Sequence, residues 1–307
     1  MLKKQALKKI LITSLTVVIL LMIYIMPSNV NSINKLKVNK TVEYVESKVG
    51  YIYLLNDNDF LVKADFLIDE YKDNTERIKC IINNLIDTST VPKGLKNIIP
   101  KKTKIKEISI NDDNIIINFS KDILDVSEEQ QEKLIESIAF SIFEIGEVKS
   151  ISILVENENI NKYFKNVPNI ITRDFGINKK YNITCLKDIQ KVVVYYINEI
   201  DNKRYLVPVT NYINDNEEKI KIIIESLSSK YIYEPNLISL LNNGTELINY
   251  EIKDDMMQLN FNNSIFMSDG NILEEVIYTI GNSIFDSYDV NKVIFNVENR
   301  FVYELVK

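Results

Sequence analysis

The sequence predicts an α+β protein in which two similar units follow a membrane-targeted N-terminus. Three observations lead to this prediction: residue blocks that recur 142 positions apart, short strands of period two, and apolar residues at helical spacing between them. The 307 residues suffice for about two domains. We expect each unit to run ββ-α-ββ-α-β, as a sandwich with its helices on one face of a sheet.

The first 49 residues predict export and attachment to a membrane. Residues 1–9 carry four lysines, and residues 10–29 contain no charged side chain. An apolar run of this length is typical of a signal anchor, although a cleaved signal peptide stays open because Val30-Asn31-Ser32 fits a cleavage site. The positive-inside rule keeps the lysines in the cytoplasm. We therefore expect a single-pass protein of the cell membrane, with a linker at 30–49 and its domains on the extracytoplasmic side.

The composition excludes several kinds of chemistry. The chain has no histidine and two cysteines, so it holds no Ser-His-Asp triad, no histidine metal ligand and no four-thiolate zinc site. Its net charge is −6, and −10 without the four N-terminal lysines, which argues against a nucleic-acid surface. There is no glycine-rich phosphate loop and no GxSxG motif, and we expect no cofactor.

The part after residue 49 is a tandem duplication. Residues 73–85 and 215–227 are identical at eight of thirteen aligned positions. The same offset of 142 recurs in blocks before and after, but between Phe119 and Val148 the alignment slips by four residues and then recovers. We predict one domain at 50–157 and a second at 190–300, with a linker at 158–189 between them and a C-terminal tail at 301–307.

Each copy predicts the same elements in the same order. A strand hairpin comes first, and a helix then begins at Asp73 or Asp215 with a glutamate three residues later, as in a capping box. A second hairpin, a second helix and a closing strand follow. In the two copies we expect the opening hairpin at 51–62 and 192–207, the first helix at 73–85 and 215–227, the second hairpin at 108–119 and 250–261, the second helix at 134–143 and 273–280, and the closing strand at 151–155 and 293–297.

Paired carboxylates are the most noticeable candidates for chemistry. Asp112-Asp113 and Asp254-Asp255 occur at equivalent places in the two copies. A glycosidase needs two carboxylates about 5–10 Å apart across a cleft. Adjacent aspartates at the tip of a hairpin point to solvent instead, and aspartate is a favoured turn residue, so we interpret both pairs as turns. A calcium loop would need further oxygen ligands at regular spacing, which are absent, so we predict no catalytic or metal-binding residue.

Three other sets of residues have structural interpretations. Glu156-Asn157 and Glu298-Asn299 end the closing strands. Cys80 occupies a position that is Ile222 in the second copy, which favours a small buried apolar residue; a disulfide with Cys185 stays open. Tyrosines at strand positions mark an interface or are simply packing. These tyrosines are Tyr51, Tyr53, Tyr195, Tyr196, Tyr231 and Tyr233.

Four stretches of each copy form a recognisable pattern of core and turn residues: 94–105 (GLKNIIPKKTKI), 118–120, 139–142 and 148–151 in the first copy, and 240–247, 259–261, 277–280 and 290–297 in the second. By these stretches both copies resemble the GerMN domain of sporulation and spore germination proteins. The second copy has no counterpart of Pro100, so its loop is less typical.

The resemblance implies a structural rather than an enzymatic protein. Its domains would be similar to the ring-building α-ββ-α-β motif of secretion-system rings. It would support a complex that links mother cell and forespore, with a membrane and proteins of that complex as partners and its oligomeric state open. Two alternatives remain: an exported module that binds a wall component or small ligand between the copies, and a wall hydrolase with an acidic pair in a cleft.

Overall fold

The computed structural model describes residues 48–68, 73–214, 217–229, 232, 236–268 and 270–307. The predicted basic segment 1–9, the predicted anchor 10–29 and all but the last two residues of the predicted linker 30–49 lie outside these residues. Within the described part, no helix is both long enough and apolar enough to cross a bilayer.

The first copy contains the expected elements, and its apolar periodicity matches its burial. The second helix buries the predicted Leu134, Ile138 and Ile142, and the closing strand alternates between buried and half-buried residues. The elements are β1 (Lys48–Asn56), β2 (Leu61–Ile68), α2 (Asn74–Ile86), β3 (Leu95–Lys96), β4 (Ile105–Asn111), β5 (Asn114–Phe119), η1 (Lys121–Leu124), α3 (Glu128–Phe143), β6 (Ser150–Val155) and β7 (Glu158–Asn159).

The second copy repeats this order. The predicted slip of four residues is wrong, because Ser141 and Ser283, at an offset of 142, make the same contact in α3 and α5. The offset of 142 therefore holds through this helix as well. The elements are β10 (Gln190–Ile200), β11 (Lys203–Ile213), α4 (Lys219–Ser228), β12 (Leu237–Ile238), β13 (Leu247–Lys253), β14 (Met256–Phe261), η4 (Asn263–Ile265), α5 (Glu274–Ser287), β15 (Lys292–Val297) and β16 (Arg300–Val306).

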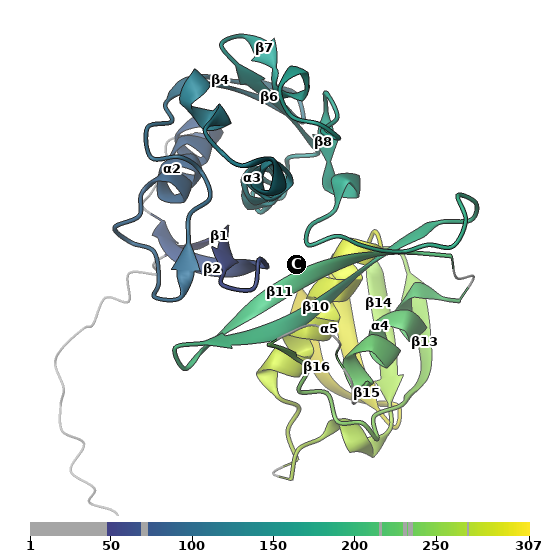
Figure 1. Ribbon diagram of the computed structural model, residues 1–307. Helices are drawn as coiled ribbons and strands as arrows, with labels where there is room; N and C mark the ends of the chain where they lie inside the picture. The colour runs from purple at the N-terminus through teal and green to yellow at the C-terminus, as the bar shows by residue number, and fades with distance from the viewer. Residues whose placement is uncertain (1–47, 69–72, 215–216, 230–231, 233–235, 269) are drawn as a thin grey trace, which may run out of the picture. The chain divides into compact units, whose positions relative to one another are not determined.

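The helices of each copy lie between two sheets, and not on one face of a single sheet as expected. Figure 1 shows α2 and α3 between the hairpin β1–β2 and the strands β4 and β6, and α5 contacts both β10 and β15. The outer sheet has the order β4-β5-β6-β7 in the first copy and β13-β14-β15-β16 in the second, with a parallel pair β5–β6 or β14–β15 at its centre. The opening hairpin does not belong to this outer sheet, because its strands pair in a separate sheet.

The two opening hairpins join into one sheet that is shared by the copies. Its order is β12-β10-β11-β2-β1-β3. The strands β12, β10 and β11 of the second copy are therefore mirrored by their equivalents β3, β1 and β2 of the first copy on the other side of the joint. The copies meet where β2 pairs antiparallel with β11, at Lys63 and Leu206. This arrangement is an isologous contact, the geometry of a two-fold symmetric dimer, formed here within one chain.

Three expectations, about the linker, the C-terminal tail and the start of one helix, are wrong. The segment 158–189 is not a plain linker, because it contains β8 (Ile171–Thr172), η3 (Arg173–Phe175) and β9 (Lys180–Asn182), of which β8 pairs with β6 and β9 with β11. Residues 301–307 are not a tail, because β16 pairs with β15 along its length. The helix α4 begins after Glu218 rather than at Asp215, and no side chain caps it.

Candidate functional site

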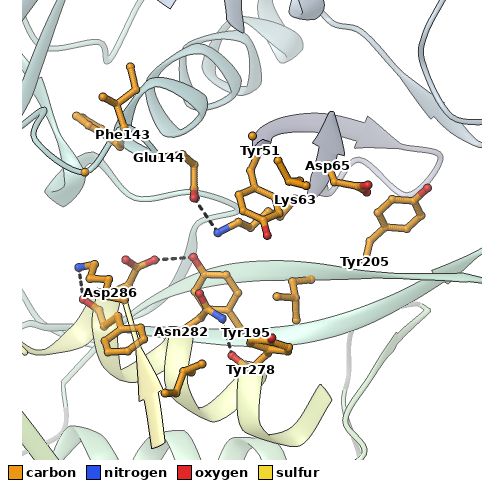
Figure 2. A pocket seen from close by; sticks show the side chains of 18 of the residues that line it. Tyr51, Lys63, Asp65, Phe143, Glu144, Tyr195, Tyr205, Tyr278, Asn282 and Asp286 are labelled. Atoms are coloured by element: carbon orange, nitrogen blue, oxygen red, sulfur yellow. Dashed lines mark hydrogen bonds and ion pairs between the residues drawn. The ribbon is translucent and has the colours of Figure 1, made fainter. Parts of the chain in front are cut away.

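A cleft of 1110 Å³ lies between the two copies, on the side of the shared sheet where α3 and α5 end. Figure 2 shows Tyr51, Lys63 and Glu144 of the first copy on one wall, with Tyr195, Tyr278 and Asp286 of the second copy opposite them. Interfaces between domains are common places for ligand sites, so this cleft is the candidate functional site.

Two equivalent tyrosines donate hydrogen bonds to two equivalent carboxylates in the cleft. The Tyr53 hydroxyl donates to Glu144 Oε1 at 2.8 Å, and the Tyr195 hydroxyl donates to Asp286 Oδ2 at 2.6 Å. Each carboxylate also has a cation: Lys63 Nζ lies 2.8 Å from Glu144 Oε2, and Arg173 Nη1 lies 3.4 Å from Asp286 Oδ1. Figure 2 shows the Lys63–Glu144 and Tyr195–Asp286 contacts as dashed lines.

A serine one helical turn before each carboxylate holds the backbone of the corresponding tyrosine. Ser141 Oγ accepts a hydrogen bond from Tyr53 N at 2.9 Å, and Ser283 Oγ accepts one from Tyr195 N at 2.8 Å. Both serine hydroxyls donate to the carbonyl four residues earlier in their own helix, which fixes their direction. The opening strand and the second helix of each copy are therefore joined by the same polar contact.

Burial keeps the two phenols protonated. Tyr53 and Tyr195 are 1% and 2% exposed, and this burial, with the neighbouring Glu144 and Asp286 charges second, raises the pKa of both phenols well above 10. A phenol with such a pKa is a hydrogen-bond donor at neutral pH and a poor proton acceptor. The geometry therefore suits a fixed structural contact better than acid–base catalysis.

The carboxyl ends of α3 and α5 both face the cleft and both carry a cation. Arg173 Nη2 donates to the Phe143 carbonyl at 2.5 Å, and Lys307 Nζ donates to the Phe285 carbonyl at 3.2 Å. A cation at a helix C-terminus offsets the partial negative charge of the free carbonyls there. Partial burial nevertheless lowers the pKa of Lys307, so the cation is held at some cost.

The charges of the cleft are balanced and mostly paired. Its lining includes five basic and five acidic residues. Besides Glu144 and Asp286, Asp65 pairs with Lys203 at 2.6 Å, and Glu275 pairs with Arg204. The cleft thus has no excess charge with which to attract an ion.

Asparagines join the copies outside the cleft. Asn56 and Asn198, which are equivalent and 142 residues apart, are both 2% exposed, and Asn56 Nδ2 donates to Asn198 Oδ1 at 3.0 Å. Nearby, Gly94 has a φ of 83°, and a Cβ there would collide with Ile200 Cγ2 of the other copy. Both features require close approach of the two copies.

The connecting segment also joins the two copies, through Asn178. Its amide nitrogen donates to the Leu61 and Pro208 carbonyls, both at 2.8 Å, and its oxygen accepts from Leu61 N at 2.9 Å. One buried side chain therefore bridges β2 and β11. Its backbone nitrogen donates to the buried Glu136, whose pKa is raised by that burial despite Lys133 and Lys179 nearby.

The aspartate pairs lie at hairpin turns, as predicted, and not in the cleft. Asp112 has a φ of 52° and Asp254 a φ of 55°, the left-handed region that aspartate tolerates in tight turns. Asp113 forms an ion pair with Lys149 at 2.6 Å across the turn. Neither pair lines the cleft, so the geometry gives these aspartates no support as the two carboxylates of a hydrolase.

The Glu-Asn pairs are turn residues as well. Glu156, Asn157, Glu298 and Asn299 all have positive φ, and they connect β6 to β7 and β15 to β16. Each asparagine is held by a strand asparagine: Asn118 Nδ2 donates to Asn157 Oδ1 at 2.7 Å, and Asn260 Nδ2 donates to Asn299 Oδ1 at 2.9 Å. The repeated pairs therefore shape the ends of strands.

The cysteines and tyrosines differ among themselves in burial, and not all of them are buried as expected. Cys80 and Cys185 are free, and Cys80 is half-buried rather than buried. Tyr51 is exposed in the cleft, Tyr53, Tyr195 and Tyr196 are buried, and Tyr231 and Tyr233 lie outside the described residues. In the described ranges no group of three or more aspartates, glutamates or cysteines is arranged to hold a metal ion.

Sequence reasoning missed Glu144, Asp286, Asn56, Asn198 and Asn178. The first four form two pairs at the same offset of 142 that pairs the turns, and this offset was the signal that could have found them. Asn178 lies in the segment that connects the copies and has no counterpart at that offset, so the sequence holds no comparable signal for it.

Comparisons with known proteins agree with the duplication. A model of the Germane family, described as sporulation and spore germination, matches residues 51–161 and 193–303. The two matched ranges are again 142 residues apart and together cover more than half of the chain.

A protein and a solved structure, both from Bacillus subtilis, match across both copies. The spore germination protein GerM of strain 168 is 22% identical over 261 residues, which span 81% of this chain and 71% of that protein. The solved structure of the tandem GerMN domains of the sporulation protein GerM has a TM-score of 0.74 at 21% identity, covering 82% of this chain and 92% of that one. The likeness to that structure establishes the tandem fold.

Proposed function

This chain belongs to the Germane family of sporulation and spore germination proteins, and from that premise we propose that it is a non-enzymatic, membrane-anchored scaffold for a complex in the envelope of the sporulating or germinating cell. Its two GerMN domains act as one body that holds partner proteins in place. Its anchor is the apolar segment 10–29, which places the domains on the extracytoplasmic side.

The use made of the repeated polar residues carries this proposal. Tyr53 and Tyr195 fix helices to strands, Asn56 and Asn198 join the copies, and the aspartate and Glu-Asn pairs form turns. The polar groups that both copies retain therefore have structural roles. The equivalent carboxylates in the cleft, Glu144 and Asp286, are each held by a tyrosine and a cation, which is a structural use as well.

Edge strands supply candidate surfaces for partners. β4, β13 and β16 are seven residues long, and each has a neighbour on one side only in its sheet. Ile252 on β13 and Phe301 on β16 are 45% and 64% exposed. An edge strand of this length is a template for pairing with another chain, and exposed apolar side chains add to its attraction.

Photo-crosslinking from these edges tests the scaffold. A photoreactive amino acid replaces Phe301 or Ile252 in the full chain, expressed in sporulating cells, and adducts are identified by mass spectrometry. We expect adducts with the same few membrane-associated proteins from both edge positions, because a scaffold presents a fixed surface to its partners.

Leu186 supplies the matched control, because it is 86% exposed and lies in the connecting segment, on none of the edge strands. The proposal fails if the edges yield no adducts, or if Leu186 yields the same ones. Deleting residues 10–29 tests the anchor: the protein should then leave the membrane fraction, and retention there would contradict the anchor.

A further inference from the structure

We propose that the cleft between the copies binds an uncharged, hydroxyl-rich ligand, an oligosaccharide. The proposal goes beyond scaffolding, because it assigns a ligand to a cavity that the scaffold does not need. It rests on the size of the cleft, its balanced charges and its tyrosines.

The size of the cleft fits a ligand larger than a single small metabolite. Its 1110 Å³ lie just above the range for small-molecule sites, about 300–1000 Å³. The cleft is framed by strands β1, β2, β10 and β11 and by the ends of α3 and α5, all elements of regular structure. A site on such elements is held in shape before its ligand arrives.

The charge pairing selects against a charged ligand. Of the five carboxylates in the lining, Asp65, Glu144, Glu275 and Asp286 each have a Lys or Arg partner. A cation would compete with one of these pairs and leave its partner uncompensated, and an anion meets no excess of positive charge, because the lining has five basic and five acidic residues. A paired carboxylate or ammonium still has free lone pairs or N–H donors, which suits hydroxyl groups.

Tyrosines supply apolar faces with polar tips. Tyr51 is 40% exposed, and Lys63 Nζ lies 4.4 Å from the centre of its ring. The hydroxyls of Tyr51 and Tyr205 have no hydrogen-bond partner within the described part of the chain. Figure 2 shows Tyr278 and Asn282 across the cleft from Tyr51. Ring faces against C–H groups, with hydroxyls and an amide at their edges, are the contacts that a sugar chain needs.

Calorimetric titration of the full chain tests the proposal. The probes are two uncharged tetramers, of N-acetylglucosamine and of glucose, with the glucosamine tetramer as a cationic probe and the galacturonate tetramer as an anionic one. We expect saturable binding of at least one uncharged tetramer with a Kd below 1 mM, and at least tenfold weaker binding of both charged probes.

Tyr51→Ala identifies the site. We expect it to raise the Kd for the uncharged tetramer at least tenfold, while Tyr163→Ala leaves the Kd unchanged, because Tyr163 is similarly exposed at 42% but lies outside the cleft. Circular dichroism checks that both variants are folded. No saturation by either uncharged tetramer, tighter binding of a charged one, or an unchanged Kd for Tyr51→Ala overturns the proposal. The crosslinks from Phe301 and Ile252 do not depend on Tyr51, so either proposal can fail without the other.

Discussion

The two copies share their internal contacts and differ at their outer edges. In both, a serine of the second helix binds the opening strand, at Ser141 and Tyr53 in the first copy and at Ser283 and Tyr195 in the second. The outer edge of β6 is covered by the two-residue strands β7 and β8, whereas β15 is covered by the seven-residue β16. The core and the joint are thus common to both copies, and the surface offered to partners is not.

This difference indicates what constrains each part of the sequence. Because an isologous joint brings equivalent residues of both copies together, a change at Asn56 or Asn198 disturbs the contact from either side. The outer edges meet no counterpart within the described residues and are free to diverge. Each copy can therefore offer a different surface while the joint stays symmetric.

Removing a core ring from either copy has the largest expected effect. Phe119 and Phe261 are equivalent and fully buried, so Phe119→Ala and Phe261→Ala should each cost about 3–5 kcal/mol of the free energy of unfolding. Urea denaturation measures this, and both variants should lower one common transition because the copies share a sheet. Phe301→Ala, on an exposed ring, is the control, with an expected change under about 0.5 kcal/mol. Two separate transitions would contradict a shared unit.

The two buried phenols should give the chain an alkaline limit. Because the pKa of Tyr53 and Tyr195 is raised in the folded state, their stabilisation is complete below the unfolded pKa of about 10 and is lost as the pH rises towards the folded values. The double variant Tyr53→Phe/Tyr195→Phe should flatten the fall of stability above pH 10 by about 2.7 kcal/mol per pH unit.

Denaturation between pH 8 and 12 measures this slope, and the two single variants should contribute about equally. Tyr51→Phe, which changes an exposed tyrosine, serves as the control. If the double variant keeps the slope of the natural chain, the phenols are not buried as described.

Loss of the Asn178 side chain should weaken the joint between the copies. Asn178→Gly keeps the positive φ of 49° but leaves the Leu61 and Pro208 backbone groups without this partner, at a cost of about 2–3 kcal/mol. Asn166 also has a positive φ, at 60°, but is exposed, so Asn166→Gly should change stability by under about 0.5 kcal/mol. Equal effects of both variants on the unfolding midpoint would argue against a special role for Asn178.

The first helices should respond differently to the loss of their N-terminal acids. Asp73 caps α2 by accepting from Glu76 N at 2.8 Å, so Asp73→Ala should cost about 1 kcal/mol. Glu218 precedes α4 without such a bond, and Glu218→Ala should cost under about 0.5 kcal/mol. Thermal denaturation distinguishes the two, and an equal loss would show that the copies begin their helices alike.

The elements that were predicted correctly are those whose sequence pattern is local, within a few neighbouring residues. Ile151, Ile153 and Val155 alternate because one face of β6 is buried, and Asp112-Asp113 mark a turn because aspartate tolerates it. The strand β16 escaped prediction because most of its residues are exposed on both faces, which leaves no clear alternation of apolar and polar positions.

The candidate site depends on contacts between copies, which local patterns do not encode. Glu144 and Asp286 face one cleft because β2 pairs with β11. This pairing joins one edge strand of each hairpin across a long separation in sequence. The offset of 142 makes the two carboxylates equivalent without saying that they lie near each other. The separation of the opening hairpin from the outer sheet was missed for the same reason.

The central claim is that the two GerMN domains form one body, and a distance measurement between them tests it directly. Spin labels at Glu107→Cys and Asn249→Cys, exposed equivalent positions on β4 and β13, in a chain with Cys80 and Cys185 changed to alanine, report that distance by pulsed electron paramagnetic resonance. We predict one narrow distance distribution, which Asn178→Gly broadens. A broad or multiple distribution with Asn178 intact would contradict the claim.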